Sequence, residues 1–289
     1  MASPTNLIDT NALIQAVSTD FVEMFGKDIK FFTETLGITR VIEVAHDEPI
    51  KRYTMAVTRP STTAGEGEEI PLTKVAKTAT TPITVQMEKE RMAVSAEAIS
   101  KYGFEAAVGE TSDELLTTLK KDIRGRFYNY LADGTGTATG ETFQMALARA
   151  WGEVQTVFED DAVETYAFAH PSDVADHLGG ANITVQTVFG MQYVTGFIGV
   201  TGVFVTSLIP EGKIYVTAGK NIVLAKLDPT KNDLASTFNL TTTAEGFVGV
   251  SFEKQLENAT YQMLALYGLT LFAENLGGVI VATIEEPMV

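Results

Sequence analysis

The 289-residue sequence predicts a folded α+β protein. Three observations predict this class: two strand-like arms flank a long polar stretch within residues 47–92, an amphipathic helix is expected at about 112–132, and strand-like and helical segments alternate over about 141–245. With 45% apolar and 20% charged residues, the chain can bury a sizeable core in one or two domains.

Composition argues against several classes of protein. The sequence has no run of about eighteen apolar residues and does not start like a signal peptide, so we expect neither a membrane segment nor secretion by that route. Because there is no cysteine, disulfides and sulfur-ligated zinc are excluded. A formal net charge of -16 argues against direct reading of nucleic acid, since that affinity depends on Lys and Arg replacing counterions.

Residues 6–36 show the first helical pattern, with apolar residues at three- and four-residue spacings. We interpret residues 1–36 as an N-terminal helix or arm. Phe31 and Phe32 could anchor a partner, but packing on the chain's own core is the favoured interpretation.

Residues 47–92 predict an extended hairpin loop. Apolar and polar residues alternate at Tyr53–Thr58 in the first arm and at 83–88 in the second. About twenty residues with few apolar anchors join the arms, a length that a compact domain rarely tolerates unless the loop is functional. We therefore predict that the tip of the loop projects toward another molecule.

The strongest helical pattern covers residues 112–132. Thr111 and Glu114 have capping-box spacing, acidic residues fall in the first turn, and basic residues follow toward the C-terminal end. One apolar stripe repeats every four residues: Leu115, Leu119, Ile123, Phe127 and Leu131. The pattern predicts a long helix that lies across a sheet or a hairpin.

A Gly-rich stretch, residues 134–140, separates this helix from a second helical pattern. A phosphate loop is disfavoured there, because the stretch follows a helix instead of a strand and has no Lys where a Walker loop needs one. We interpret it as a flexible linker that opens an α/β or α+β unit over about 141–245. Residues 246–289 predict strands that return to the first domain, with a helix at Gln255–Tyr267 as the alternative.

No catalytic, cofactor or metal site is predicted. His46, His170 and His177 are the candidates for acid or base chemistry, but each has a structural explanation. His170, Asp173 and His177 form a conceivable metal trio, although closed zinc or iron sites usually bring further ligands. The acidic clusters lack the spacing of a calcium loop, so solvated charge is the favoured interpretation.

The order of these parts resembles the major capsid proteins of tailed bacteriophages, which have the Hong Kong 97-like fold. Residues 112–136 resemble the spine helix of that family and its exit. Other segments resemble its axial domain and its closing peripheral strands: 169–173, 189–193, 210–215, 221–225, 271–275 and 278–281. The resemblance covers nearly the whole chain and depends on the order of the motifs, since each motif alone is weak.

The resemblance implies a division into domains. Residues 1–36 would be an N-terminal arm, and 37–140 a peripheral domain that carries the extended loop and the spine helix. Residues 141–245 would form an α/β axial domain, and 246–289 the closing strands of the peripheral domain.

The resemblance also implies a function. The chain would be a structural protein, not an enzyme, that self-assembles into hexamers and pentamers of an icosahedral shell around double-stranded DNA, without sequence-specific binding. Its location would be the virion capsid, and the host cytoplasm during assembly. Its partners would be further copies, a portal protein and decoration proteins. A separate scaffolding protein is also implied, unless the chain is already processed, because the folded pattern begins almost at Met1.

Two alternatives stay open. An encapsulin, a bacterial compartment of the same fold, would hold enzyme cargo in place of a genome, and a cargo groove cannot be read from the sequence. A phage shell is favoured over it. The more remote alternative is a soluble α/β enzyme that uses Asp173 and His177. Catalytic turnover by the purified protein, or bound metal in it, would support this alternative.

Charge segregation in the extended loop predicts contacts between copies, because an acidic tip favours a complementary surface on a neighbour and contributes register and selectivity. The predicted contact residues are Arg59, Glu66, Glu68, Glu69, Lys74, Lys77, Lys120, Lys121, Arg124 and Arg126. We hypothesise that the three acids of the tip meet the helical bases of an adjacent subunit. By resemblance, Lys74 or Lys77 could donate to a chemical crosslink, but crosslinking is disfavoured because no Asn partner is identified.

Overall fold

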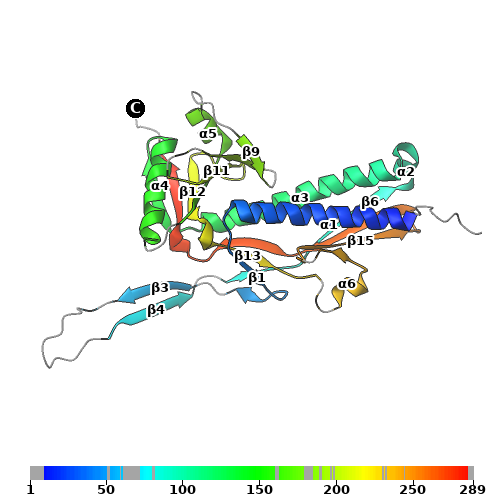
Figure 1. Ribbon diagram of the computed structural model, residues 1–289, viewed down its shortest axis with the longest axis horizontal. Coiled ribbons are helices and arrows are strands. Elements are labelled where there is room, and N and C mark those ends of the chain that lie inside the picture. The colour runs from blue at the N-terminus through cyan, green and yellow to red at the C-terminus, as the bar shows by residue number, and fades with distance from the viewer. Residues whose placement is uncertain are drawn as a thin grey trace, which may run out of the picture.

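A computed structural model shows an elongated α+β molecule, which confirms the predicted fold class (Figure 1). Two long helices run along the molecule, a body of sheet and helix lies at one end, and a narrow two-stranded ribbon extends beyond it. The structure describes residues 10–50, 53–58, 60, 72–79, 82–159, 163–178, 185–188, 191–195, 197, 199–229, 231, 233–243 and 245–285.

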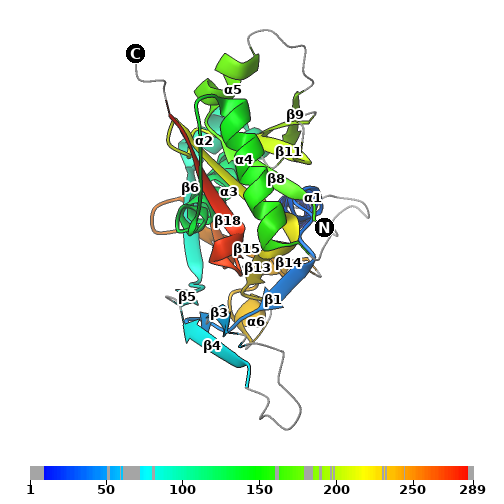
Figure 2. The same ribbon diagram turned by 90° about the vertical axis from the view of Figure 1, so that its left-hand side faces the viewer.

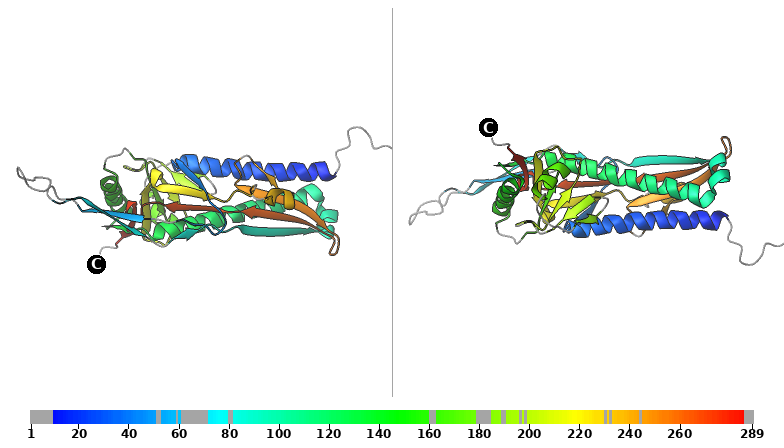
Figure 3. Two further views of the ribbon diagram at one scale, coloured as in Figure 1. Left: turned by 90° about the horizontal axis from the view of Figure 1, so that it is seen from below. Right: turned by 90° about the horizontal axis from the view of Figure 1, so that it is seen from above.

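The long part of the molecule combines helices with an antiparallel four-stranded sheet (Figures 1 and 3). The helices are α1 (Thr10–Thr35), α2 (Ala96–Tyr102) and α3 (Phe104–Ala132). The strands, in sheet order, are β14 (Thr241–Thr242), β15 (Val248–Gln255), β16 (Thr260–Tyr267) and β6 (Glu88–Ser95). Because β16 is a strand, the alternative of a helix over residues 255–267 is wrong.

One large core joins these elements. The apolar stripe of α3 is buried along its length, and Leu119, Ile123 and Phe127 are each 0% exposed. One face of α1 joins the same core through Phe21, Val22, Phe25, Ile29 and Phe32. Of the aromatic pair predicted to pack internally, Phe32 is therefore buried, whereas Phe31 is exposed.

The start of α3 differs from the predicted start at residue 112. The helix begins at Phe104, after Gly103 with a φ of 85° separates it from α2. Thr111 lies inside the helix, where its hydroxyl donates a hydrogen bond to the carbonyl oxygen of Ala107. Its capping-box spacing is therefore misleading, because the Ala- and Glu-rich residues before it continue the helix.

The body at one end is a mixed seven-stranded sheet. Its strands, in order, are β7 (Gly136–Gly140), β18 (Val279–Ile284), β12 (Lys213–Ala218), β8 (Thr165–Ala169), β11 (Gly202–Val205), β10 (Met191–Val194) and β9 (Val185–Val188). Helix α4 (Phe143–Val157) lies on one face of the sheet, and α5 (Pro171–Leu178) packs beside it (Figure 2). The opposite face contributes Phe168 and Phe204 to the large core.

Residues 136–140 form a strand, so the predicted flexible linker is wrong for this segment. β7 pairs with β18 in parallel, and its glycines allow close packing. A Cβ atom at Gly136 would lie 2.1 Å from Ile280 Cδ1, and one at Gly140 would lie 2.3 Å from the backbone nitrogen of Ala146. Glycine is needed here for space, which a sequence pattern cannot distinguish from flexibility.

A three-stranded sheet connects the two parts of the molecule. β13 (Ile222–Lys226) lies between β1 (Arg40–Glu43), to which it is parallel, and β17 (Leu269–Ala273), to which it is antiparallel. The remaining short elements are α6 (Leu234–Thr237) and the 3-10 turns Gly219–Asn221 and Leu276–Gly278.

Three strands pair across the predicted domain boundaries. β7 and β18, both predicted to be peripheral, belong to the seven-stranded sheet, and β13 pairs outside the predicted axial segment. Strand pairing between distant segments, which local periodicity does not report, is the reason. The division into domains otherwise stays a prediction.

The extended hairpin exists, but its second arm differs from the predicted one. β3 (Tyr53–Thr58) pairs with β4 (Lys74–Ala79), and β2 (Pro49–Ile50) pairs with β5 (Ile83–Thr84) nearer the body. The predicted second arm at 83–88 is wrong, because its apolar residues turn into the body and Glu88 already begins β6.

No helix in the described ranges is long and apolar enough to cross a membrane.

We predict that Gly140→Ala lowers the free energy of unfolding by about 1–3 kcal/mol, because the added methyl group would overlap the backbone of α4. Urea unfolding of the unassembled protein measures the change. The control is Gly152→Ala, within α4, where no atom lies within 4 Å of the added Cβ. It should be neutral or stabilising by up to about 1 kcal/mol, and equal effects of the two changes would contradict the packing argument.

Candidate inter-subunit contact surface

The ribbon formed by β3 and β4 is attached to the body through a small apolar core, which we call the ribbon root. Its buried members are Ile83, Val85, Val223, Ala225, Leu227 and Phe272. Ile83 and Val85 are 2% and 1% exposed, so the chain is anchored immediately after the ribbon returns. Backbone hydrogen bonds, such as the 3.3 Å bond from Asp47 N–H to the Val85 carbonyl oxygen, connect the two sides of the root.

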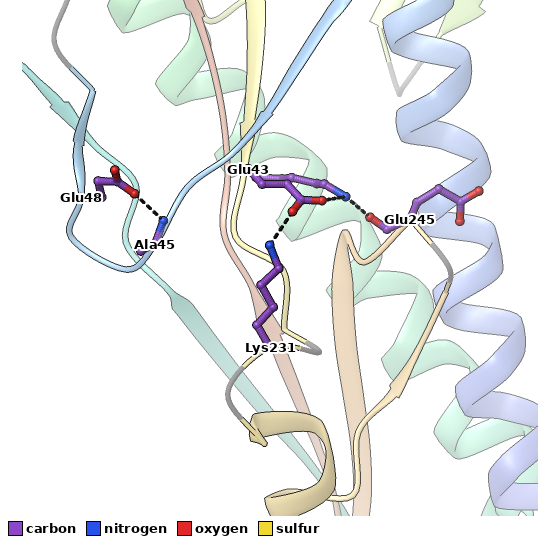
Figure 4. A network of polar contacts seen from close by, with 6 residues as sticks. Glu43, Ala45, Glu48, Lys231 and Glu245 are labelled. Carbon is purple, nitrogen blue, oxygen red and sulfur yellow. Dashed lines mark hydrogen bonds and ion pairs between the residues drawn. The ribbon is translucent and has the colours of Figure 1, made fainter.

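A polar network reinforces the ribbon root from outside (Figure 4). Glu43, at the end of β1, accepts contacts from Lys226 at 3.2 Å and from Lys231 at 2.5 Å. Lys226 also donates a 2.5 Å hydrogen bond to the backbone carbonyl oxygen of Glu245. The network therefore connects β1 and β13 with the segments that follow β13 and precede β15.

The two lysines affect the ionisation of Glu43. The hydrogen bond from Lys231, followed by that from Lys226, holds the pKa of Glu43 below its usual value of 4.5. The carboxylate is exposed, so each ion pair contributes modestly. Its contacts are between distant segments, because they join β1 to β13 and to Lys231.

The ribbon itself lies outside the body. Figures 1 and 3 show β3 and β4 extending away from all other elements that the structure describes. Leu72 and Val75 are 92% and 56% exposed, and Lys74 is exposed beside them. Of the predicted contact residues in the loop, Lys74 and Lys77 lie on β4. The others, Arg59, Glu66, Glu68 and Glu69, lie outside the described residues.

Three of the four helical bases predicted to contact a neighbour have contacts within their own chain. Lys120 forms an ion pair with Asp28 of α1. Arg124 is half-buried, its Nε donates to the Lys120 carbonyl oxygen at 3.2 Å, and burial lowers its pKa. Arg126 lies 2.5 Å from Glu88 of β6. Lys121 is exposed and is the most accessible of the four.

The sequence did not indicate the charged pairs that lie beside the ribbon root. Glu43 lies 188 positions from Lys231 along the chain, and no spacing rule relates them. The same holds for Arg40, whose Nη1 donates to Glu274 at 2.6 Å across the three-stranded sheet. Only the pairing of β1 with β13 and of β13 with β17 brings these charges together.

The histidines and Asp173 make ordinary structural contacts. Nδ1 of His46 accepts from Met87 N–H at 3.3 Å, and Nδ1 of His170 accepts from Ser172 N–H at 3.2 Å. The ring of His177 packs 5.6 Å from that of Phe143. The Asp173 carboxylate accepts from Gly212 N–H, and burial raises its pKa. No three His, Asp or Glu side chains of the described part of the chain are grouped as metal ligands.

Comparison with known proteins identifies the fold. The chain is similar to the holo-SrpI encapsulin complex from Synechococcus elongatus PCC 7942, with a TM-score of 0.54, 12% identity and 88% of each chain covered. It is also similar to a structure of Mycobacterium phage Patience, with a TM-score of 0.52, 10% identity, and coverage of 100% of this chain and 96% of that one. The capsid structure of Cyanophage P-SCSP1u has a TM-score of 0.52, 9% identity and 88% of each chain covered.

No protein-family model and no curated protein sequence matches the chain. At these low identities the solved structures establish the fold alone. The chain has the Hong Kong 97-like fold of capsid and encapsulin shells, as the resemblance of its sequence implied.

We predict that Glu43→Gln lowers the free energy of unfolding at neutral pH and that this difference disappears in acid. Because the folded state lowers the pKa of Glu43, its stabilising contribution is complete above the usual value of 4.5 and is lost as the pH falls through the lowered value. Urea unfolding at neutral pH and at about pH 2.5 tests this.

The control for that series is Glu245→Gln, since Lys226 contacts the backbone carbonyl of Glu245 and not its carboxylate. This change should have little effect at either pH. A Glu43→Gln difference that persists unchanged in acid would contradict the network as described.

We predict that Arg126→Met destabilises the unassembled protein by about 0.5–1 kcal/mol, because it removes a charge-assisted hydrogen bond to Glu88, whose carboxylate is partly exposed. Lys121→Met, on the exposed face of the same helix, should change the free energy of unfolding by less than about 0.5 kcal/mol. Thermal unfolding of both variants measures the contrast, and a larger effect at Lys121 would show that the internal assignment of Arg126 is wrong.

Proposed function

We propose that the chain is a shell-forming protein and, more specifically, the major capsid protein of a tailed bacteriophage. The observation that carries the proposal is the ribbon of β3 and β4, which stands clear of the body on a fixed root. A two-stranded ribbon is at best marginally stable in water by itself, so it requires a surface on another molecule. The Hong Kong 97-like fold supports a shell as that setting.

Many identical copies can supply such a surface. A ribbon that reaches from one copy to a different surface of the next makes a heterologous contact, which generates closed rings when the rotation closes. We propose hexamers and pentamers in an icosahedral shell, located in the virion capsid and, during assembly, in the host cytoplasm. The proposed partners are a scaffolding protein, a portal protein and decoration proteins. A net charge of -16 suits a shell that encloses double-stranded DNA without adhering to it.

An encapsulin-type compartment is the second candidate, because the similarity to the holo-SrpI encapsulin complex is at least as high as that to the phage structures named above. In that case the shell would enclose protein cargo. The two candidates share the assembly and differ in the contents of the particle.

Electron microscopy of the expressed protein, with and without the proposed scaffolding protein, tests shell formation. We expect closed particles with icosahedral symmetry. A protein that stays monomeric at high concentration in both preparations would contradict a shell. Assay of particles purified from the native source for packaged DNA or for an enclosed enzyme decides between the two candidates.

We predict that the double charge reversal Glu68→Lys with Glu69→Lys reduces particle yield, because it reverses the charge of the loop tip where complementarity selects the neighbour. Circular dichroism of the unassembled protein should be unchanged. If Lys121 is the contacted base, Lys121→Glu should restore part of the yield in the same background. Normal particles from the double reversal would reject the charge hypothesis.

A further inference from the structure

We propose that one face of the ribbon, the face that carries Val57 and Val75, is buried against a second copy of this chain, while the opposite face stays in contact with water. This inference rests on the proposed function and specifies it further, because it states which side of the ribbon forms the contact.

The register of β3 and β4 defines the two faces. Residues directly opposite each other in an antiparallel pair share a face, and successive residues along a strand alternate between faces. One face, the Val57–Val75 face, carries Tyr53, Met55, Val57, Val75, Lys77 and Ala79. The other, the Ala56–Ala76 face, carries Thr54, Ala56, Thr58, Lys74, Ala76 and Thr78. The large apolar residues therefore all belong to one face.

This arrangement is unfavourable for an isolated chain. Val75, on the Val57–Val75 face, is 56% exposed. Apolar groups on a two-stranded ribbon with open edges invite nonspecific pairing with other chains. A soluble chain that retains such a face is expected to cover it in its working state.

The ribbon cannot cover this face with its own body in the geometry of the structure. Figures 1 and 3 show β3 and β4 extending away from the other described elements, and among the described residues the two strands pair only with each other. The covering surface must therefore come from another molecule.

Charge identifies a second copy as that molecule. The two ribbon strands contain two bases, Lys74 and Lys77, and no acid, whereas the whole chain has 37 acidic and 21 basic residues. A positively charged ribbon is thus complementary to the negative field of another copy. By register, Lys77 lies on the Val57–Val75 face and Lys74 on the opposite face, so one of the two bases accompanies the apolar residues.

The test compares Val75→Asp with Ala76→Asp, which place the same charge at neighbouring positions on opposite faces. We expect Val75→Asp to lower particle yield by at least about tenfold, because a carboxylate would be buried in the contact without a partner, and Ala76→Asp to change it by less than about twofold. Circular dichroism of each unassembled variant controls for folding. Equal losses, or a larger loss at Ala76, would overturn the inference.

A second measurement does not depend on yield. Because the chain has no cysteine, Val75→Cys and Ala76→Cys each introduce a single thiol. In particles, the thiol at 75 should react with a maleimide at least about tenfold more slowly than the thiol at 76, and after dissociation the two rates should become similar. Equal rates in intact particles would contradict burial of the Val57–Val75 face without contradicting shell formation. Failure of the wild-type protein to form particles would contradict both proposals.

Discussion

Burial of the apolar stripe of α3 is the interaction on which the other parts of the structure depend. Leu119, Ile123 and Phe127 are inaccessible to solvent, and they contact α1, the strands beneath the helix and the large sheet. Phe127 lies 5.4 Å from Phe168 of β8 in an edge-to-face arrangement, so the end of α3 reaches into the seven-stranded sheet. One long helix therefore packs against both parts of the molecule and holds them in a fixed relation.

Charged residues around α3 strengthen this frame. Lys120 and Arg126 bind acids of α1 and β6, each a different element packed against the helix. Such pairs contribute less free energy than the core does, but they select one arrangement of the elements over others. Three of the four bases of α3 predicted to contact a neighbour make contacts within the chain, and Lys121 is the most exposed of the four.

The ribbon of β3 and β4 is a two-stranded sheet that no other described strand extends. Its root is buried, and its strands pair only with each other among the described residues. In the proposed shell, a ribbon anchored by a buried root would lose less conformational freedom on binding, so more of the contact energy would remain as affinity.

The sequence alone determined the elements whose information is local. The i, i+4 stripe of α3 and the alternation in Tyr53–Thr58 follow from the periods of helix and strand, and the order of the parts was sufficient to indicate the fold. Tertiary structure decided what depends on distant partners. β18 joined the seven-stranded sheet, 83–85 turned into the ribbon root, residues 136–140 became a strand, and Glu43 met Lys231. The physical reason is that strand pairing and ion pairs form between residues close in space, and periodicity along the chain carries no record of that distance.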